Sequence, residues 1–348
     1  MSKQLRVYLG STTGLEVWDV TDGSWARQSS ALDGAVRVMT GRTDQPGTVY
    51  AGIMNDGVYR TTDAGAHWKR VFEGDARSLA VDPHDQRVVY VGTSPVHLHR
   101  SDDGGETWNE IVSLQSIPEE FKREWWGPTE PHDGHVMKIL IDPDDAQYLY
   151  LCLEHGGVVR SLDRGETWED VSGGITYLDM HSIARHPGKR GTYFVSSARG
   201  FFRSDDPAAG WSHVDATMPW GDSAPQNYSH DFVVLPEAEG SDDVTLVVAG
   251  ANGSPGFWRR PSKAECVILR SDDGAKSWRE ITNGLPAKPP EMAWALVGHP
   301  TDPDSLLAGY SDGDSGTGQL YATGDRGDSW QRVDGPFPAI RSLWLETA

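Results

Sequence analysis

Four histidines from neighbouring strand-like segments could together hold a metal ion. They are His135, His155, His181 and His230, with Glu154 before His155 and Asp231 after His230. Neutral imidazoles and carboxylates from neighbouring strands bind divalent cations and can leave one position open for water or a carbonyl oxygen. The four histidines therefore predict a divalent metal of unspecified identity. The alternative, that they line a polar channel or bond to loops, stays open.

Other residues could bind or activate a substrate beside such an ion. The candidates for moving a proton are His132, Asp179 and Glu291. The aromatic residues expected to wall a ligand are Trp125, Trp126, Trp220, Trp294 and Tyr228. The reaction expected at such a site is hydrolysis or elimination on a small molecule.

Three arginines, Arg37, Arg77 and Arg341, are expected to bind the substrate. A guanidinium group offers paired N–H donors that match a carboxylate or a phosphate, which predicts an anionic substrate. The alternative is pairing with local acids, for which Asp75, Asp179 and Glu346 are the candidates, since an enclosed arginine must find an anion.

A repeated turn must position all these residues. The stretch RSDDGGETW at 100–108 recurs as RTTDAGAHW at 60–68 and RSLDRGETW at 160–168. The pattern Ser/Thr-x-Asp-x-Gly-x-x-Trp is complete four times, while Ala208 and Ala275 replace the glycine in two further copies. It predicts a β-turn that Ser/Thr and Asp side chains close, that needs a positive φ at glycine, and that buries the tryptophan.

Four strand-like runs surround each turn, and tryptophans at 25, 68, 108, 168, 211, 278 and 330 count seven units. The fold class predicted is all-β, a seven-bladed β-propeller of four-stranded antiparallel blades in one domain over 1–348. A C-terminal strand at 339–346 is expected to join the N-terminal blade and close the ring. Long inserted loops at about 109–134, 212–229 and 251–265 are expected on the face opposite the repeated turns.

The first strands of the units align on one position, six residues before the turn proline or its equivalent. From unit one to unit seven it holds Arg341, Arg37, Arg77, Met137, His181, His230 and Trp294. If the register holds, these side chains surround the channel of the propeller, which is where a site is expected.

Composition excludes some classes of function. The chain has 348 residues and a net charge of −20, which repels nucleic acid. Cys152 and Cys266 lie in apolar runs and are expected to be buried thiols. No segment reads as a signal peptide, a membrane span or a nucleotide-cofactor motif, so a cytoplasmic protein without membrane contact is expected.

The repeated turn resembles that of the Asp-box (BNR-repeat) propellers, which include sialidases, xyloglucanases, sortilin-type receptors and photosystem II assembly factors. The resemblance covers essentially the whole chain. The resemblance implies the propeller fold. The chain departs from true sialidases, because it lacks their Arg-Ile-Pro motif and has seven units where they have six.

Three functions follow. The leading one is a His/Arg-rich site at the channel mouth, acting as a metal-dependent hydrolase or lyase on an anionic small molecule. The first alternative, implied by resemblance to the assembly factors, is a non-catalytic scaffold that binds a protein partner. The second is a glycoside hydrolase or carbohydrate-binding protein of sialidase-like type, with a glycan ligand.

Overall fold

The computed structural model describes residues 4–122, 125, 133–214, 227–237, 243–253, 255, 264–311 and 316–347. The chain divides into two compact units. The first unit comprises residues 1–170 and 340–348, and the second comprises residues 171–339. Among the described residues, no helix is long and apolar enough to cross a membrane.

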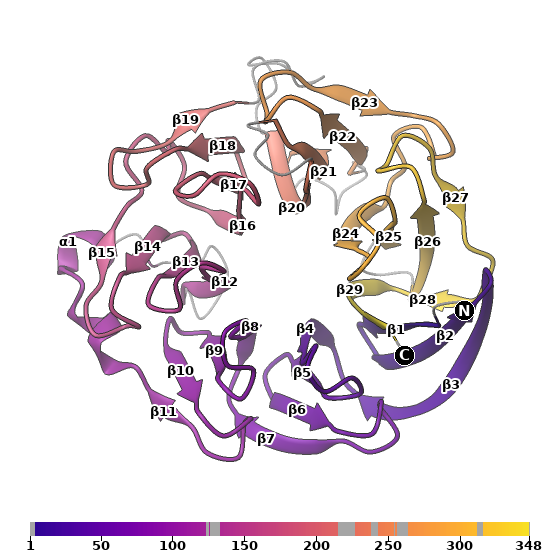
Figure 1. Cartoon of the computed structure of the whole chain (residues 1–348), viewed down its shortest axis with the longest axis horizontal. Helices are drawn as coiled ribbons and strands as arrows, with labels where there is room; N and C mark the ends of the chain where they lie inside the picture. The colour runs from indigo at the N-terminus through magenta and orange to yellow at the C-terminus, as the bar shows by residue number, and fades with distance from the viewer. Residues whose placement is uncertain are drawn as a thin grey trace. The chain divides into compact units, whose positions relative to one another are not determined.

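The first unit holds four antiparallel sheets of four strands each (Figure 1). In the order of pairing, the first is β29 (Ile340–Thr347), β1 (Leu5–Ser11), β2 (Gly14–Thr21) and β3 (Ser24–Asp33). The second is β4 (Val36–Gly41), β5 (Val49–Ile53), β6 (Gly57–Thr61) and β7 (Lys69–Glu73). The third is β8 (Ala76–Val81), β9 (Val89–Thr93), β10 (Leu98–Ser101) and β11 (Asn109–Glu110). The fourth is β12 (His135–Ile141), β13 (Leu149–Glu154), β14 (Gly157–Ser161) and β15 (Glu169–Asp170).

The second unit holds three sheets built in the same way. The first of them is β16 (Met180–Arg185), β17 (Tyr193–Ser197), β18 (Gly200–Ser204) and β19 (Ser212–His213). The next is β20 (Asn227–Leu235), β21 (Thr245–Asn252), β22 (Val267–Ser271) and β23 (Arg279–Ile281). The last is β24 (Met292–Gly298), β25 (Leu306–Ser311), β26 (Thr317–Thr323) and β27 (Gln331–Arg332), with the short β28 (Phe337–Pro338) paired to β26.

These seven sheets confirm the predicted all-β fold of seven antiparallel blades. Within each unit, the first strands of consecutive sheets lie next to one another: β29, β4, β8 and β12 in the first unit, and β16, β20 and β24 in the second. The second strand of each sheet is almost wholly buried, which explains why runs such as VYVGT in β9 and LYLCLE in β13 are continuously apolar and do not alternate.

Small residues on the second strands let neighbouring sheets pack closely. A Cβ atom added to Gly92 of β9 would lie 2.4 Å from the Ser78 hydroxyl and 2.5 Å from Val136 of the next sheet. Cys152 takes the corresponding position in β13, opposite Lys138, and its thiol is fully buried. Burial raises the pKa of Cys152 well above its usual value, as expected for a buried thiol.

The repeated turns form the predicted hydrogen-bond network. In the turn at 101–108, the Ser101 hydroxyl donates to Asp103 and accepts from the Gly105 N–H, both at 2.7 Å. The Asp103 carboxylate also accepts from the Thr107 N–H and hydroxyl, at 2.9 and 2.6 Å. Gly105 has a φ of +90°, and Trp108 donates its indole N–H to a carbonyl of the preceding sheet, that of Val71 (2.9 Å). This turn thus closes a hairpin and fastens two adjacent sheets.

The C-terminal strand completes the N-terminal sheet as predicted, although it spans Ile340–Thr347 and not 339–346. Glu346 anchors it. The Glu346 carboxylate accepts from the Tyr8 hydroxyl (2.7 Å) and from the Gly47 N–H (3.0 Å). Glu346, one of the acids considered as a partner of the arginines, therefore has a structural role at this end of the sheet.

The long loops are partly described. The loop predicted over 109–134 begins with β11 and carries the short helices η1 (Val112–Ser116) and α1 (Glu119–Lys122). For the loop predicted over 212–229, β19 ends at His213 and β20 begins at Asn227. For the loop predicted over 251–265, β21 ends at Asn252 and β22 begins at Val267.

Candidate functional site

Every sheet inserts one extra residue into its first strand as a β-bulge. In the second sheet, Val36 pairs with Ile53 and Val38 with Gly52, which leaves Arg37 as the insertion. The bulges of the other sheets fall at Arg341, Arg77, Met137, His181, His230–Asp231 and Trp294. These bulge residues are the ones that the sequence aligns, so the predicted register is confirmed. A bulge re-aims the side chain it carries, which is why bulges are frequent beside binding sites.

Three bulge residues of the first unit are arginines, on three consecutive sheets. Arg37 is exposed, whereas Arg77 is half-buried. The Arg77 guanidinium donates to Asp75 Oδ2 from Nε (2.8 Å) and Nη2 (2.5 Å). The other oxygen of Asp75 accepts from the Asn55 N–H (2.9 Å). Asp75 therefore neutralises Arg77, which is the alternative to substrate binding that the sequence left open for the arginines.

His135 begins the fourth sheet and faces Glu154, its cross-strand partner, across a gap of 3.3 Å between Nε2 and Oε2. Burial lowers the pKa of His135 to about 4, and the nearby Arg77 guanidinium contributes in the same direction. The imidazole is thus neutral at pH 7. From the sequence, Glu154 could be recognised only as the neighbour of His155. Its pairing with His135 depends on the register between β12 and β13, which joins residues far apart in the chain.

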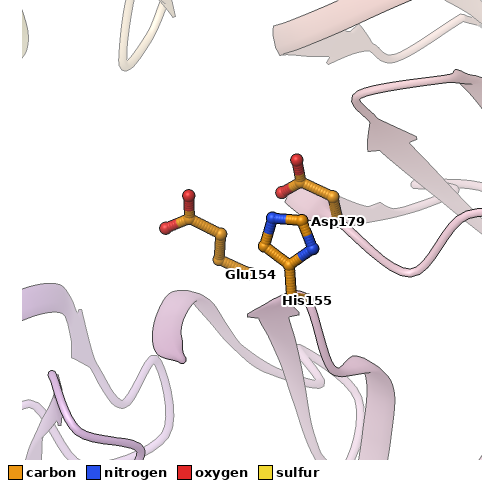
Figure 2. Close-up of side chains that lie close together, drawn as sticks. All are labelled: Glu154, His155 and Asp179. Carbon is orange, nitrogen blue, oxygen red and sulfur yellow. The ribbon is translucent and has the colours of Figure 1, made fainter. Parts of the chain in front are cut away.

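Glu154 and His155 form the end of β13 and the turn into β14, and Figure 2 shows their side chains as they leave that turn. Asp179, also drawn there, belongs to the second unit. His155 has a φ of +52°, in the left-handed region that few residues other than glycine adopt. Asn55 occupies the corresponding turn of the second sheet with a φ of +59°. The backbone strain at His155 is therefore shared with a turn that carries no histidine.

Trp125, a predicted ligand-wall residue, packs against the fourth sheet. A Cβ atom added to Gly156 would lie 2.8 Å from the Trp125 ring, and one added to Gly134 would lie 3.1 Å from its backbone. Both glycines are therefore required for Trp125 to lie close to the starts of β12 and β14. This places the half-buried Trp125 ring near the turn that carries Glu154 and His155.

Four side chains form a continuous row of rings in the second unit. The ring centroids of His181 and Tyr228 are 4.6 Å apart, and those of His181 and His230 are 5.4 Å apart. Tyr228 stacks on His230 at 6.0 Å, and Trp294 meets His230 edge-on at 5.0 Å. We call Tyr228, His181, His230 and Trp294 the aromatic row. All four were predicted as site residues, and the structure brings them together.

Backbone carbonyl groups orient two members of the aromatic row. His181 Nδ1 lies 2.7 Å from the Ser229 carbonyl, so this nitrogen carries the proton and donates it. The other nitrogen, Nε2, lies 3.5 Å from the Asp179 carboxylate. Trp294 donates its indole N–H to the Ser311 carbonyl (3.1 Å). The rings are therefore held in set orientations before any ligand binds.

Glu291, a predicted proton carrier, lies in the second unit just before β24. Its charge acts on the Cys266 thiol and on the Tyr321 hydroxyl, and it contributes to raising the pKa of both. Burial is the main cause of the Cys266 shift, to about 12. Cys266 is a buried free thiol, as predicted.

The predicted metal ligands are distributed over both units, and three other predicted site residues are not described by the structure. His132, Trp126 and Trp220 lie outside the described residues. Of the predicted metal ligands, His135 and His155 belong to the first unit, and His181 and His230 to the second. Among the described residues of either unit taken alone, no three His, Cys, Asp or Glu side chains place ligand atoms within 4.8 Å of one another. A neutral His135 suits metal binding, and the divalent metal stays a prediction.

Comparison with known proteins places this chain among propellers. No family model matches it. A xyloglucanase of Paenibacillus sp is 24% identical over 258 residues, which are 65% of this chain and 24% of that enzyme. The chain thus spans about a quarter of the length of the first xyloglucanase relatives it matches.

Solved structures extend the likeness to nearly the whole chain. The GH74 xyloglucanase of Xanthomonas campestris has a TM-score of 0.72 at 19% identity, over 95% of this chain and 53% of that one. A structure of YCF48 bound to D1 peptide has a TM-score of 0.58 at 16% identity, over 99% of this chain and 96% of that one. At these identities the likeness is one of fold, and it confirms the seven-bladed propeller predicted from the repeated turns.

Proposed function

We propose that this chain binds an oligosaccharide on the aromatic row of its second unit, as a propeller of the glycoside hydrolase type. The observation that carries the proposal is the aromatic row, in which Tyr228, His181, His230 and Trp294 lie within 4.6–6.0 Å of their neighbours. Sugars present apolar C–H faces and polar hydroxyl edges. A row of rings with oriented nitrogen atoms offers both kinds of contact.

Sequence relatives support the same class of ligand, since those named above are xyloglucanases. Hydrolysis of a glycosidic bond requires two carboxyl groups, one on each side of the bond. Asp179, beside His181, and Glu291, just before β24, are the candidate carboxyl groups of the second unit. His181 would orient Asp179, a role that does not require a metal ion.

The first experiment is calorimetric titration of the full chain with a panel of neutral oligosaccharides, xyloglucan fragments included. Substituting Trp294→Leu should weaken binding about tenfold or more, since stacking on its ring is lost while apolar packing is kept. Trp25→Leu is the matched control, because Trp25 is also half-buried but belongs to the first sheet, where it meets Trp18 edge-on. If no oligosaccharide binds the folded wild-type protein, the proposal is wrong.

The second experiment separates an enzyme from a binding protein. Release of reducing ends should be abolished by Asp179→Asn and by Glu291→Gln, with oligosaccharide affinity kept within about threefold. Tight binding without any turnover by the wild-type protein would instead assign a carbohydrate-binding role.

A protein-binding scaffold is the second candidate. Its support is that Arg341, Arg37 and Arg77 occupy the bulge of three consecutive sheets in the first unit, and that the YCF48 structure with its peptide matches nearly the whole chain in fold. Peptide binding that is lost in Arg37→Glu, with no response to any oligosaccharide, would favour this candidate over the first.

A further inference from the structure

Arg199 lies in the turn between β17 and β18 of the second unit, and its guanidinium group packs against an aromatic ring. Its guanidinium carbon lies 4.3 Å from the centroid of the Tyr177 ring, a cation–π contact. Arg199 is exposed, and among the described residues no carboxylate forms an ion pair with it. Neither Arg199 nor Tyr177 is among the site residues predicted from the sequence.

The surroundings of Arg199 connect it to the aromatic row. Ala198, its neighbour, donates its N–H to the carbonyl oxygen of Asp179 (2.9 Å), and Ser197 pairs with Met180. Ala198 and Tyr228 belong to one buried cluster, against which Tyr177 also packs. Arg199 therefore lies beside the strand start that carries Asp179 and His181, next to the rings of the proposed glycan site.

Other arginines of the second unit are neutralised by acids close in sequence or space. Arg203 pairs with Asp205, Arg270 with Asp272 and Arg326 with Glu237, at 2.6–3.1 Å. Arg199 differs from these arginines although the chain has a net charge of −20 and is therefore rich in acidic side chains. The acid placed closest along this strand start, Asp179, instead faces His181 at 3.5 Å.

A guanidinium group stacked on a ring keeps its N–H edge available, and this edge matches the two oxygens of a carboxylate. We propose that Arg199, held on Tyr177, selects an acidic sugar by binding the carboxylate of a uronate residue in the oligosaccharide. This inference rests on the proposed function, because the aromatic row would bind the neutral part of the same ligand.

The test compares two ligands that share one backbone. Calorimetry would measure binding of a β-1,4-linked glucose tetramer and of its C6-oxidised tetraglucuronate to the full chain. The wild-type protein should bind the tetraglucuronate about tenfold more tightly, and Arg199→Gln should remove this preference while leaving the affinity for the neutral tetramer unchanged. Arg332→Gln, an equal change of charge at an exposed position of β27, is the matched control.

Variants of Tyr177 test the stacking. Tyr177→Phe keeps the ring and should keep the preference, whereas Tyr177→Leu should reduce it severalfold because the cation–π contact is lost. A thermal melt of each variant confirms that it is folded. Equal reduction of both affinities by Arg199→Gln would overturn the assignment, since the residue would then act on the site as a whole.

The failures can be told apart. If neither tetramer binds the folded wild-type protein, the proposed function fails. If both bind equally, glycan binding stands and the role of Arg199 is wrong. A sulfated tetramer that binds more tightly than the tetraglucuronate would overturn the choice of a carboxylate.

Discussion

His135 Nε2 lies 3.3 Å from Glu154 Oε2, and the two residues are direct cross-strand partners at the start of β12 and the end of β13. The pair holds a neutral imidazole against a carboxylate close to two bulge arginines, Arg77 and Arg37, whose charges both act on His135. This arrangement links the geometry of the first unit to a measurable dependence on pH.

The stability of the protein should fall as the pH decreases from about 6.5 to about 4. The pKa of His135 is about 4 in the folded protein, against about 6.5 for an unfolded chain, so in this range the unfolded chain takes up a proton that the native state excludes. Urea unfolding between pH 4 and 7.5 measures the slope, and NMR titration of the imidazole measures the pKa directly. His135→Gln should flatten the slope, and His67→Gln, at an exposed position, should not. An imidazole that titrates near pH 6.5 would contradict this prediction.

Gly92→Ala should destabilise the protein by about 1–3 kcal/mol, because the added methyl group would overlap the Ser78 hydroxyl and Val136 of the next sheet. Denaturant unfolding provides the measurement. Gly324→Ala is the control, since its added Cβ atom meets no atom within 4 Å. Equal stability of the two variants would show that the sheets are less closely packed than the structure indicates.

Ala275→Gly should stabilise the protein by about 1 kcal/mol. Ala275 stands where the complete turns have glycine, and its φ of +73° is costly for a residue with a Cβ atom. The reciprocal variant Gly105→Ala, at a φ of +90°, should destabilise by a similar amount. Thermal unfolding should show shifts of opposite sign, and shifts of the same sign would refute the argument.

Glu346→Ala should cost about 3 kcal/mol, because it leaves both the buried Tyr8 hydroxyl and the Gly47 N–H without their acceptor. Tyr8→Phe removes one donor and keeps the other, so a loss of about 1 kcal/mol is expected. Hydrogen exchange of the β29 amides should rise more in the first variant than in the second. Unchanged exchange in both would mean that the anchor does not hold this strand.

The fold was predictable because its signals are local. The Asp103 turn contains within eight residues every donor and acceptor that closes it, so the pattern Ser-x-Asp-x-Gly-x-x-Trp can be recognised without knowledge of distant contacts. Six copies of this turn, together with the tryptophan at position 25, then predict the number of sheets. The alignment of Arg37 with Arg77 and His181 was also predictable. Each of these bulge residues lies six residues before the proline, or its equivalent, in the turn that follows the first strand of its sheet.

The partners of those residues were less predictable. Asp75 was one of several acids that could neutralise an arginine, and only the folded chain selects it for Arg77. Arg199 carries no sequence signal, because its contact with Tyr177 depends on how a turn packs against a connection 22 residues earlier.

The repeated turn, the seven sheets and the equivalent positions that hold Arg37, His181 and Trp294 follow from short-range periodicity, so they can be predicted from the amino-acid sequence. The contacts between side chains form only in the folded chain: His135 with Glu154, Arg77 with Asp75, and the rings of Tyr228, His181, His230 and Trp294. They could not be predicted because strand register and sheet packing join residues far apart in the chain. A pattern that repeats along the sequence defines equivalent positions, but the side chains that differ between repeats determine the chemistry.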